Sequence, residues 1–234
     1  MYTGPNIVRS GLVLSLDAAN PKSYVSGSTV WNDLSNNNNT NTLVNTPTFS
    51  SVNGDGLVFN GTTQYVSASD STSLRPTSFS IDTWFRPTSL GAYNTVVVKP
   101  VNGPAWTPPY LSYMIRLQSG TSLECSTNTG GTYRSLSTSR TFSTNTTYNV
   151  SFTANSSTGA LVVYLNGSVL NSTTTTAGAI TYTALPLLIG ASHGASPVGE
   201  YFAGSIYSVK IYNTILSSTE ITQNYEAQKT RFGL

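Results

Sequence analysis

The stretch TYNVSFTANSSTGALVVYLNGSVL, residues 147–170, decides the fold class. Its apolar side chains alternate with polar ones in two runs, which is the period of a half-buried β-strand. In the second run, Asn166-Gly167 stands between two apolar segments, and this pair predicts a tight hairpin because a type I′ turn needs positive φ at both central residues. We therefore expect a strand over residues 147–155 and a hairpin over residues 159–170.

The same alternation recurs along most of the chain, with turn residues between the runs. Short alternating runs at this spacing are typical of an antiparallel sandwich rather than of alternating strands and helices. Beyond the first stretch, strands are expected over residues 11–18, 56–69, 78–87, 94–100, 109–118, 121–128, 185–192 and 204–212. The low-complexity stretch SNNNNTNT, residues 35–42, predicts a surface loop.

The last part of the chain changes from strand spacing to helix spacing. Ser217 stands three residues before Glu220, the spacing of a capping box in which each side chain satisfies the other's backbone N–H. Ile221 and Tyr225 follow four residues apart and form one apolar stripe. We expect one short C-terminal helix, over about residues 217–230, that packs this stripe on the sandwich.

Length and composition favour one folded domain. The chain has 234 residues, of which 38% are hydrophobic, and it shows neither a composition shift nor an internal repeat. We expect an extended arm over residues 1–10 and a single domain over residues 11–234. Charged residues make up 9% and the net charge is +2, so nucleic acid is not expected as a partner. The chain contains no apolar segment of membrane-spanning length and no signal-peptide pattern at its start, so no membrane partner is expected.

Several of these segments resemble a known family. FSIDTWFRP (79–87), residues 147–170, LPLLIGAS (185–192) and YFAGSIYSVKIYNTILSSTEI (201–221) are similar to consecutive strands of the laminin-G-like domains of the concanavalin A-like lectin/glucanase superfamily. LVFNGTTQYV (57–66) resembles their early strand, so that the similarity covers about residues 11–225. This resemblance implies an all-β jelly-roll sandwich of two antiparallel sheets.

Calcium is the one cofactor that the sequence leaves open. Where members of this family often carry acidic residues, this chain has Asn60, Gln64 and Ser208, which puts the family's calcium site in doubt. Asp17 and Asp33 are the remaining candidates, since calcium prefers carboxylate and carbonyl oxygens and asparagines stand nearby. The alternative, which we favour, is that Asp17 ends a strand and Asp33 caps a turn.

Catalytic patterns are missing from the chain, and we expect a protein that is not an enzyme. Retaining glucanases need two carboxylates about 5 Å apart. Glu124 stands alone in sequence, and Asp82 has no acidic neighbour on its strand face. His193 is the single histidine, which excludes metal sites built from several histidines, and the single cysteine, Cys125, is expected to be a buried hydrophobic residue.

The two ends of the chain carry a second resemblance. GLVLSLDAANPKSY (11–24) with WNDLSNNNNT (31–40), and EITQNYEAQKTRFGL (220–234), are similar to stand-alone proteins of this fold from tailed phages, especially phages of marine bacteria. The resemblance implies a virion protein on the particle surface, assembled in the host cytoplasm, that decorates the capsid or forms a head fibre. Its partners would be other virion proteins, either the major capsid protein or tail components. A homo-oligomer is left open.

The alternative function is a carbohydrate-binding, lectin-like adhesin that recognises a glycan of the host surface from a tail fibre or a similar position. Sugars are held by aromatic faces and a few fixed polar groups. Two connections, KPVNGPAWTPPYLSY (99–113) and ASHGASPVGEYF (191–202), combine such groups. The candidate contacts to a ligand or a partner protein are Trp106, Tyr110, His193 and Glu200.

Overall fold

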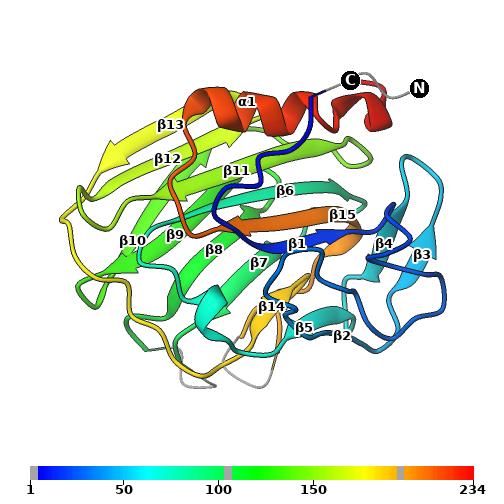
Figure 1. The fold of residues 1–234 in the computed structure, drawn as a ribbon, viewed down its shortest axis with the longest axis horizontal. Helices are drawn as coiled ribbons and strands as arrows, with labels where there is room; N and C mark the ends of the chain where they lie inside the picture. Colours follow the sequence, from blue (N-terminus) through cyan, green and yellow to red (C-terminus); the bar gives the residue numbers. More distant parts are fainter. Residues whose placement is uncertain (1–4, 103–106, 194–197) are drawn as a thin grey trace.

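The alternating runs form two antiparallel sheets in a computed structural model, which describes residues 5–102, 107–193 and 198–234. The sheets lie face to face, and the single α-helix of the described residues lies over one of them (Figure 1). The expected all-β jelly-roll sandwich with one short C-terminal helix is therefore confirmed. No helix in the described ranges is long and apolar enough to cross a membrane.

The first sheet has eight strands among the described residues, in the order β13-β12-β11-β6-β15-β4-β3, with β1 also paired to β15. Its strands are β1 (Leu12–Asp17), β3 (Thr48–Ser50), β4 (Gly56–Asn60), β6 (Phe79–Pro87), β11 (Tyr148–Ala154), β12 (Ala160–Leu165), β13 (Ser168–Thr174) and β15 (Ala203–Tyr212). The long strand β15 pairs along one side with β6 and along the other with β4 and then β1.

The second sheet has seven strands among the described residues, in the order β10-β9-β8-β7-β14-β5-β2. Its strands are β2 (Asn41–Val44), β5 (Tyr65–Ala68), β7 (Tyr93–Pro100), β8 (Leu111–Gln118), β9 (Ser122–Thr129), β10 (Thr132–Ser139) and β14 (Leu187–Ile189). A short 3₁₀ helix, η1 (Thr72–Leu74), follows β5.

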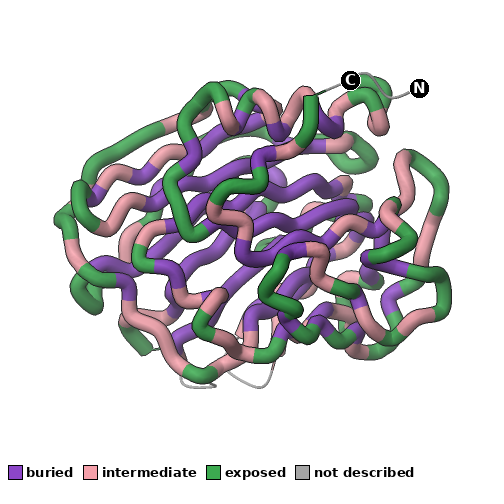
Figure 2. The backbone as a smooth tube through the Cα atoms, in the orientation of Figure 1, coloured by how far each residue is buried: buried purple, intermediate pink, exposed green. Residues whose placement is uncertain are grey.

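The core lies between the two sheets, and the alternation within each strand decides what enters it. In β8, Tyr113, Ile115 and Leu117 belong to the main buried cluster, whereas the side chains between them face away from the other sheet. Buried residues follow the central strands of both sheets, and exposed residues gather in the connections (Figure 2). Cys125 belongs to this core, and its burial raises the pKa of the thiol well above the usual value.

The predicted hairpin and the predicted cap are both present. Asn166 and Gly167 have φ values of 50° and 77° and connect β12 to β13. The helix α1 (Ser218–Glu226) begins with the full capping box between Ser217 and Glu220. It ends four residues earlier than expected, because the chain turns at Gln228 and places that side chain against the buried Lys210, with 2.6 Å between Gln228 Oε1 and Lys210 Nζ. A second 3₁₀ helix, η2 (Lys229–Phe232), follows.

The helix covers the outer face of the eight-stranded sheet. The indole ring of Trp84 in β6 stacks on Tyr225 of α1, with 5.5 Å between the ring centroids, and on Phe232 of η2, with 4.5 Å between the centroids. Ile221 is fully buried in a small cluster with Tyr212 of β15. The apolar stripe of the helix therefore packs on the sandwich, as expected from its spacing.

Residues 5–10 of the expected arm run alongside α1 (Figure 1). The backbone N–H of Val8 donates to Asn224 Oδ1 at 2.8 Å, and the hydroxyl of Tyr212 donates to the carbonyl of Val8 at 3.1 Å. Gln223 donates from Nε2 to the carbonyl of Asn6 at 2.7 Å. Residues 5–10 are therefore hydrogen-bonded to α1 and β15 of the same chain. Residues 1–4 lie outside the described ranges.

Three strands were missed, and two expectations about local structure need correction. The missed strands β2, β3 and β10 carry too few apolar residues to show alternation; of the β10 side chains only Leu136 is buried. The run expected over 56–69 is two strands, β4 and β5, in different sheets. The stretch 35–42 is not wholly a surface loop, because Asn39 and Asn41 are buried and bond to backbone carbonyls.

Candidate functional site

The outer face of the seven-stranded sheet carries polar side chains in ordered rows. Strand pairing places residues of β7, β8 and β9 directly opposite one another, and residues two apart in a strand share a face. Two neighbouring rows form the centre of this face: Tyr93, Gln118 and Ser122 in the first, and Thr95, Arg116 and Glu124 in the second. The face is therefore a cross-strand array of hydroxyl, amide and charged groups.

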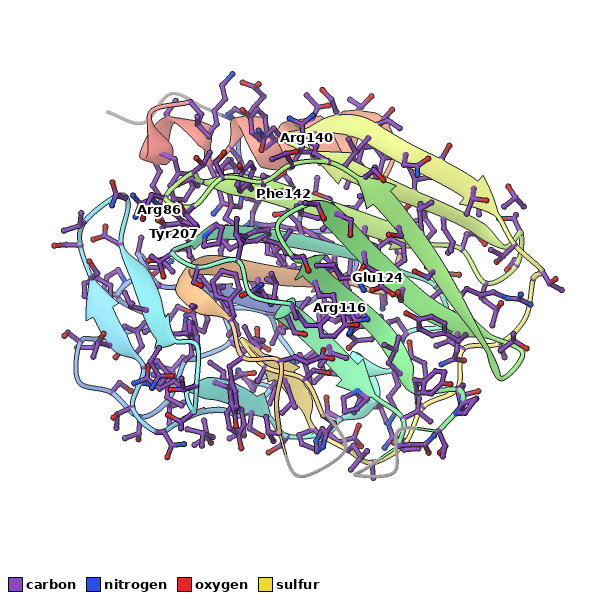
Figure 3. The ribbon with its side chains drawn as sticks, turned by 180° about the vertical axis from the view of Figure 1, so that it is seen from behind. Arg86, Arg116, Glu124, Arg140, Phe142 and Tyr207 are labelled. Atoms are coloured by element: carbon purple, nitrogen blue, oxygen red, sulfur yellow. The ribbon has the colours of Figure 1, made fainter. Side chains whose placement is uncertain are left out.

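Arg116, Glu124 and Glu200 form a charged group in the second row, which we call the Arg116 cluster. The guanidinium donates from Nε to Glu124 Oε2 at 2.8 Å and from Nη1 to the two oxygens of Glu200 at 3.1 and 3.0 Å. Arg116 and Glu124 lie side by side on neighbouring strands (Figure 3), whereas Glu200 comes from the connection between β14 and β15. Each carboxylate is thus fixed by the same cation.

Further hydrogen bonds hold both carboxylates in place. Glu124 Oε1 accepts from the hydroxyls of Tyr133, Ser126 and Ser135, the last two at 3.1 Å. Glu200 Oε2 accepts from Thr95 Oγ1 at 3.1 Å, and the carbonyl of Glu200 accepts from the backbone N–H of Thr95 at 3.1 Å. The connection that carries Glu200 is thereby attached to the edge of β7.

The ionisation of the cluster follows from these contacts. Burial disfavours the charged form of Arg116, but the two carboxylates outweigh it and raise the pKa of the guanidinium. Burial likewise opposes the charge on Glu124, but the hydrogen bond from Tyr133 and the charge of Arg116 lower the pKa of this carboxyl below its usual value. Burial and the nearby Glu124 raise the pKa of Tyr133 to about 12. At neutral pH, Arg116 and Glu124 are charged and Tyr133 is neutral.

Two hydrogen-bond donors in these rows, Arg116 Nη2 and Gln118 Nε2, have no partner among the described residues. Within the described residues, Arg116 Nη2 makes no hydrogen bond, since Nε and Nη1 alone serve the carboxylates. Gln118 accepts from Ser122 Oγ at 3.2 Å through Oε1, and its Nε2 donates to no described residue. Arg116 is 8% exposed, so a molecule on this face reaches its guanidinium only over a small area.

A shallow hollow adjoins the cluster at the first row, and we call it the Tyr93 depression. Its volume is about 220 Å³, and it is lined by Ala92, Tyr93, Gln118, Ser119, Thr121 and Ser122. Tyr93 is 44% exposed, and the Arg116 guanidinium carbon lies 4.4 Å from its ring centroid. This cation–π contact fixes the ring in orientation and leaves an aromatic surface open to solvent.

A second aromatic hollow lies at the other end of the sandwich. Tyr24 and Phe49 stack there with 5.7 Å between their ring centroids, in a hollow of about 370 Å³ that is otherwise lined mainly by hydroxyl groups, glycine and proline. Tyr24 is only 5% exposed, however, and its ring is part of the main core. Phe49 is half-buried, so neither ring of the larger hollow is as exposed as that of Tyr93.

The structure brings together some of the residues that the sequence singled out. Glu200 belongs to the Arg116 cluster, and Tyr110 packs edge-to-face on Tyr133 with 5.5 Å between the ring centroids. Both have positive φ, 50° and 59°, which is uncommon outside glycine and marks tightly constrained backbone. His193 is half-buried and lies in the same connection as Glu200. Trp106 lies outside the described residues.

Tyr93, Arg116 and Glu124 were not among the predicted contacts. Their pairing depends on strand register, which the sequence shows only indirectly. The turn at residues 119–121 places Gln118 opposite Ser122. Two positions further from the turn on each strand, Arg116 therefore lies opposite Glu124. A three-residue turn centred on Gly120 is the sequence signal that would have predicted this ion pair.

The two calcium candidates have structural roles. Asp33 accepts five hydrogen bonds, from the backbone of Ser15, Ser35 and Asn39 and from the side chains of Ser35 and Asn39. Asp17 pairs with Arg231, with 2.7 Å between Oδ1 and Nη1. No group of three or more acidic, histidine or cysteine side chains that could hold a metal ion occurs in the described part of the chain. The carboxylates of Asp17 and Asp33 are therefore both satisfied by groups of the protein itself.

Comparisons with known proteins agree with this fold. Residues 60–222 match the Laminin_G_3 model, described as the concanavalin A-like lectin/glucanases superfamily. A search of curated proteins found no match.

Solved structures with the same fold are similar to this chain at low sequence identity. The botulinum neurotoxin serotype G binding domain is 15% identical with a TM-score of 0.71, over 94% of this chain and 51% of that one. The binding domain of Paraclostridial Mosquitocidal Protein 1 is 18% identical with a TM-score of 0.71, over 92% and 52%. The Ruminococcus gnavus sialidase CBM40 bound to α2,3-sialyllactose is 15% identical with a TM-score of 0.57, over 64% and 83%. The chain thus spans about half of the two toxin structures.

Proposed function

This chain belongs to the concanavalin A-like lectin/glucanases superfamily, and from this premise we propose that it is a carbohydrate-binding domain whose binding site is the Tyr93 depression. The observation that carries the proposal is the ring of Tyr93, which is 44% exposed and fixed on the Arg116 guanidinium beside a polar floor. An aromatic face next to a few fixed polar groups is the arrangement that sugars need. The similar structures include two binding domains and a CBM40 with a bound oligosaccharide, which supports this class of function.

The size of the depression limits what it holds. Pockets for drug-sized ligands usually measure roughly 300–1,000 Å³. At about 220 Å³ the Tyr93 depression is smaller and more open, so it suits one terminal sugar residue rather than an enclosed oligosaccharide. Affinity for a single sugar residue is low, and we expect useful binding to require several copies of the domain on one surface.

We further propose that the domain binds sugars without cleaving them. A glycosidase needs a carboxylic acid that is still protonated near neutral pH. The pKa of Glu124 is instead lowered by Tyr133 and Arg116 against the effect of burial, so this carboxyl is a poor proton donor. Its oxygens are also occupied by Arg116 and three hydroxyls.

The similar proteins support the carbohydrate-binding expectation better than that of a virion structural protein. Capsid decoration, virion partners and a position on the virion surface stay predictions of the sequence resemblance. A lectin-like role is compatible with them, because a glycan-binding domain on a particle surface would act as an adhesin.

The test is a glycan array probed with the protein, followed by titration of the best ligand into two variants of Tyr93. Tyr93→Ala removes the aromatic face and should weaken binding at least tenfold, a loss of about 1.4 kcal/mol. Tyr93→Phe keeps the ring and should stay within about threefold of the wild type, which is less than 1 kcal/mol. Val169→Ala, which truncates an exposed side chain on the other sheet, should leave affinity unchanged. Equal affinity of wild type and Tyr93→Ala would overturn the proposed site.

A further inference from the structure

We infer that the sugar bound at the Tyr93 depression is neutral and that acidic sugars are rejected there. The inference rests on the proposed function and adds the class of ligand. It distinguishes this chain from the similar CBM40, whose structure contains a sialylated ligand. The charges of the outer face, the hydrogen bonds that Arg116 already makes and the remaining polar groups all favour a neutral ligand.

The charge balance of the site is negative. Arg116 supplies one positive charge, and Glu124 and Glu200 supply two negative ones, all joined by contacts of 2.8–3.1 Å. None of the described residues that line the depression is charged, so the Arg116 cluster, which adjoins it through the ring of Tyr93, supplies these charges from beside it. Arg140 follows β10, and its backbone N–H donates to the carbonyl of Thr121 at 2.9 Å, so this exposed residue adjoins the far side of the depression, apart from Arg116 and Glu124 (Figure 3). A carboxylate placed on the Arg116 side of the depression would therefore meet a cluster with a net charge of −1.

The hydrogen bonds of Arg116 exclude the usual way of holding a carboxylate. An arginine binds a carboxylate well through two parallel N–H groups. Nε and Nη1 of Arg116 are already committed to Glu124 and Glu200, which leaves Nη2 as the remaining donor. Nη2 is a single donor nitrogen with two N–H groups, and beside two fixed carboxylates it suits hydroxyl groups, which can accept from it and carry no charge.

The other groups around the depression are neutral as well. Gln118 offers an amide, and Ser119, Thr121 and Ser122 offer hydroxyls. Hydroxyl and amide groups both donate and accept, so they match the hydroxyls of a sugar without regard to charge. The aromatic face of Tyr93 binds the C–H face of a sugar ring, which neutral and acidic sugars share. Discrimination therefore depends on the Arg116 cluster.

The experiment compares pairs of related glycans of which only one member carries carboxylate groups. Suitable probes are lactose with α2,3-sialyllactose, galactan fragments with galacturonan fragments, and oligomannose with oligomannuronate. At 20 mM salt we expect at least tenfold weaker binding of the acidic member of each pair that binds. Raising the salt to 300 mM should narrow this difference, because exposed charges are screened over shorter distances, whereas binding of the neutral member should change little.

Two variants connect the discrimination to the cluster. Glu200→Gln changes the net charge of the cluster from −1 to 0 and should bring acidic glycans within about threefold of the neutral ones. Glu200→Asp keeps the charge and should keep the tenfold difference. Thermal unfolding of each variant shows whether it is folded, and the salt series on the wild type tests the inference even if one variant is not.

The outcomes separate the two proposals. Preference for the neutral members, lost in Glu200→Gln, supports both. Equal or tighter binding of the acidic members, weakened by Tyr93→Ala, overturns the inference and keeps the proposed function. Binding to none of the neutral or acidic probes, even when the protein is presented as a multivalent display, overturns both.

Discussion

Arg116 is the residue on which the outer face of the seven-stranded sheet depends. Its side chain lies under the ring of Tyr93 and between Glu124 and Glu200, so it joins three strands and one connection. A buried charge that loses its partner is expensive, whereas a fully paired cluster is tolerated. The same contacts that make the site rigid therefore make it sensitive to pH and to substitution.

The first prediction at this scale concerns Glu124. Its folded pKa lies below the usual 4.5, so the folded state binds a proton less readily than the unfolded chain. The ionised Glu124 therefore stabilises the folded state. This stabilisation is fully present at pH values above the unfolded pKa of about 4.5, and it is lost as the pH falls through the lower pKa of the folded state. Glu124→Gln should cost about 1–3 kcal/mol of unfolding free energy at pH 7 and clearly less at pH 3, measured by urea unfolding.

Glu226→Gln is the matched control for this prediction. Glu226 pairs with Lys229 on the surface, where solvent and salt screen the two charges and the pair adds little to stability. Its effect should be small at both pH values. A cost of Glu124→Gln that stays the same from pH 7 to pH 3 would contradict the assigned ionisation.

A second prediction at the residue scale concerns Gly204, near the start of β15, where it lies opposite Pro87 of β6. Its φ is +138°, and an added Cβ would lie 2.2 Å from the carbonyl oxygen of Arg86. Gly204→Ala should cost at least about 3 kcal/mol or prevent folding, because backbone atoms cannot move aside cheaply. Gly27→Ala has positive φ but open space and should cost about 1–2 kcal/mol. Equal costs in chemical unfolding would contradict the register of these strands.

At the scale of elements, α1 and η2 together seal the outer face of the eight-stranded sheet. They cover Trp84 with Tyr225 and Phe232, and Gln228 reaches the buried ion pair between Lys210 and Asp82. A helix of this length has little stability of its own, so its packing and its cap hold it in place. Loss of the cap should therefore destabilise the contacts between the helix and the sheet as well as the helix itself.

The capping box gives the prediction at this scale. Ser217→Ala removes the hydrogen bond from the Glu220 backbone N–H to Ser217 Oγ and should cost about 0.5–2 kcal/mol. Ser218→Ala, one residue later and exposed, should cost less than about 0.5 kcal/mol. Chemical unfolding gives both values. A larger effect for Ser218 than for Ser217 would contradict the position of the helix start.

The elements also show what the sequence alone could predict. The hairpin at Asn166-Gly167 and the capping box at Ser217 and Glu220 were predictable because each is a local contact with its own residue signature. β10 was not, since its stability comes from pairing with β9 rather than from apolar alternation. The candidate site was predictable only in part. Glu200 was found as a polar residue of a long connection, but its partner Arg116 depends on register across two strands and a distant loop.

At the scale of the whole molecule, the sandwich presents its two outer faces differently. The face of the eight-stranded sheet is covered by α1, η2 and residues 5–10, whereas the face of the seven-stranded sheet carries the Arg116 cluster and the open ring of Tyr93. The covered face explains how the chain is held together. The open, polar face carries the binding site that we propose.

One prediction at this scale concerns calcium. The carboxylate of Asp33 accepts five hydrogen bonds, and that of Asp17 pairs with Arg231. Neither carboxylate therefore needs a metal ion to balance its charge or to fill its hydrogen-bonding positions. The melting temperature should be the same within about 1 °C in 5 mM EDTA and in 5 mM calcium chloride, since a bound ion at a large excess over its Kd would stabilise the fold by about 2.7 kcal/mol or more. A rise of several degrees in calcium would contradict these structural roles.

The measurement that tests the central claim most directly is amide chemical-shift mapping by NMR, with the strongest neutral glycan from the array as the titrant. The account predicts shifts at residues 91–95 and 117–124, around the Tyr93 depression, and none at those positions in Tyr93→Ala. Shifts gathered instead around Tyr24 and Phe49, or along α1, would place carbohydrate binding elsewhere and contradict the claim that the seven-stranded sheet carries the site.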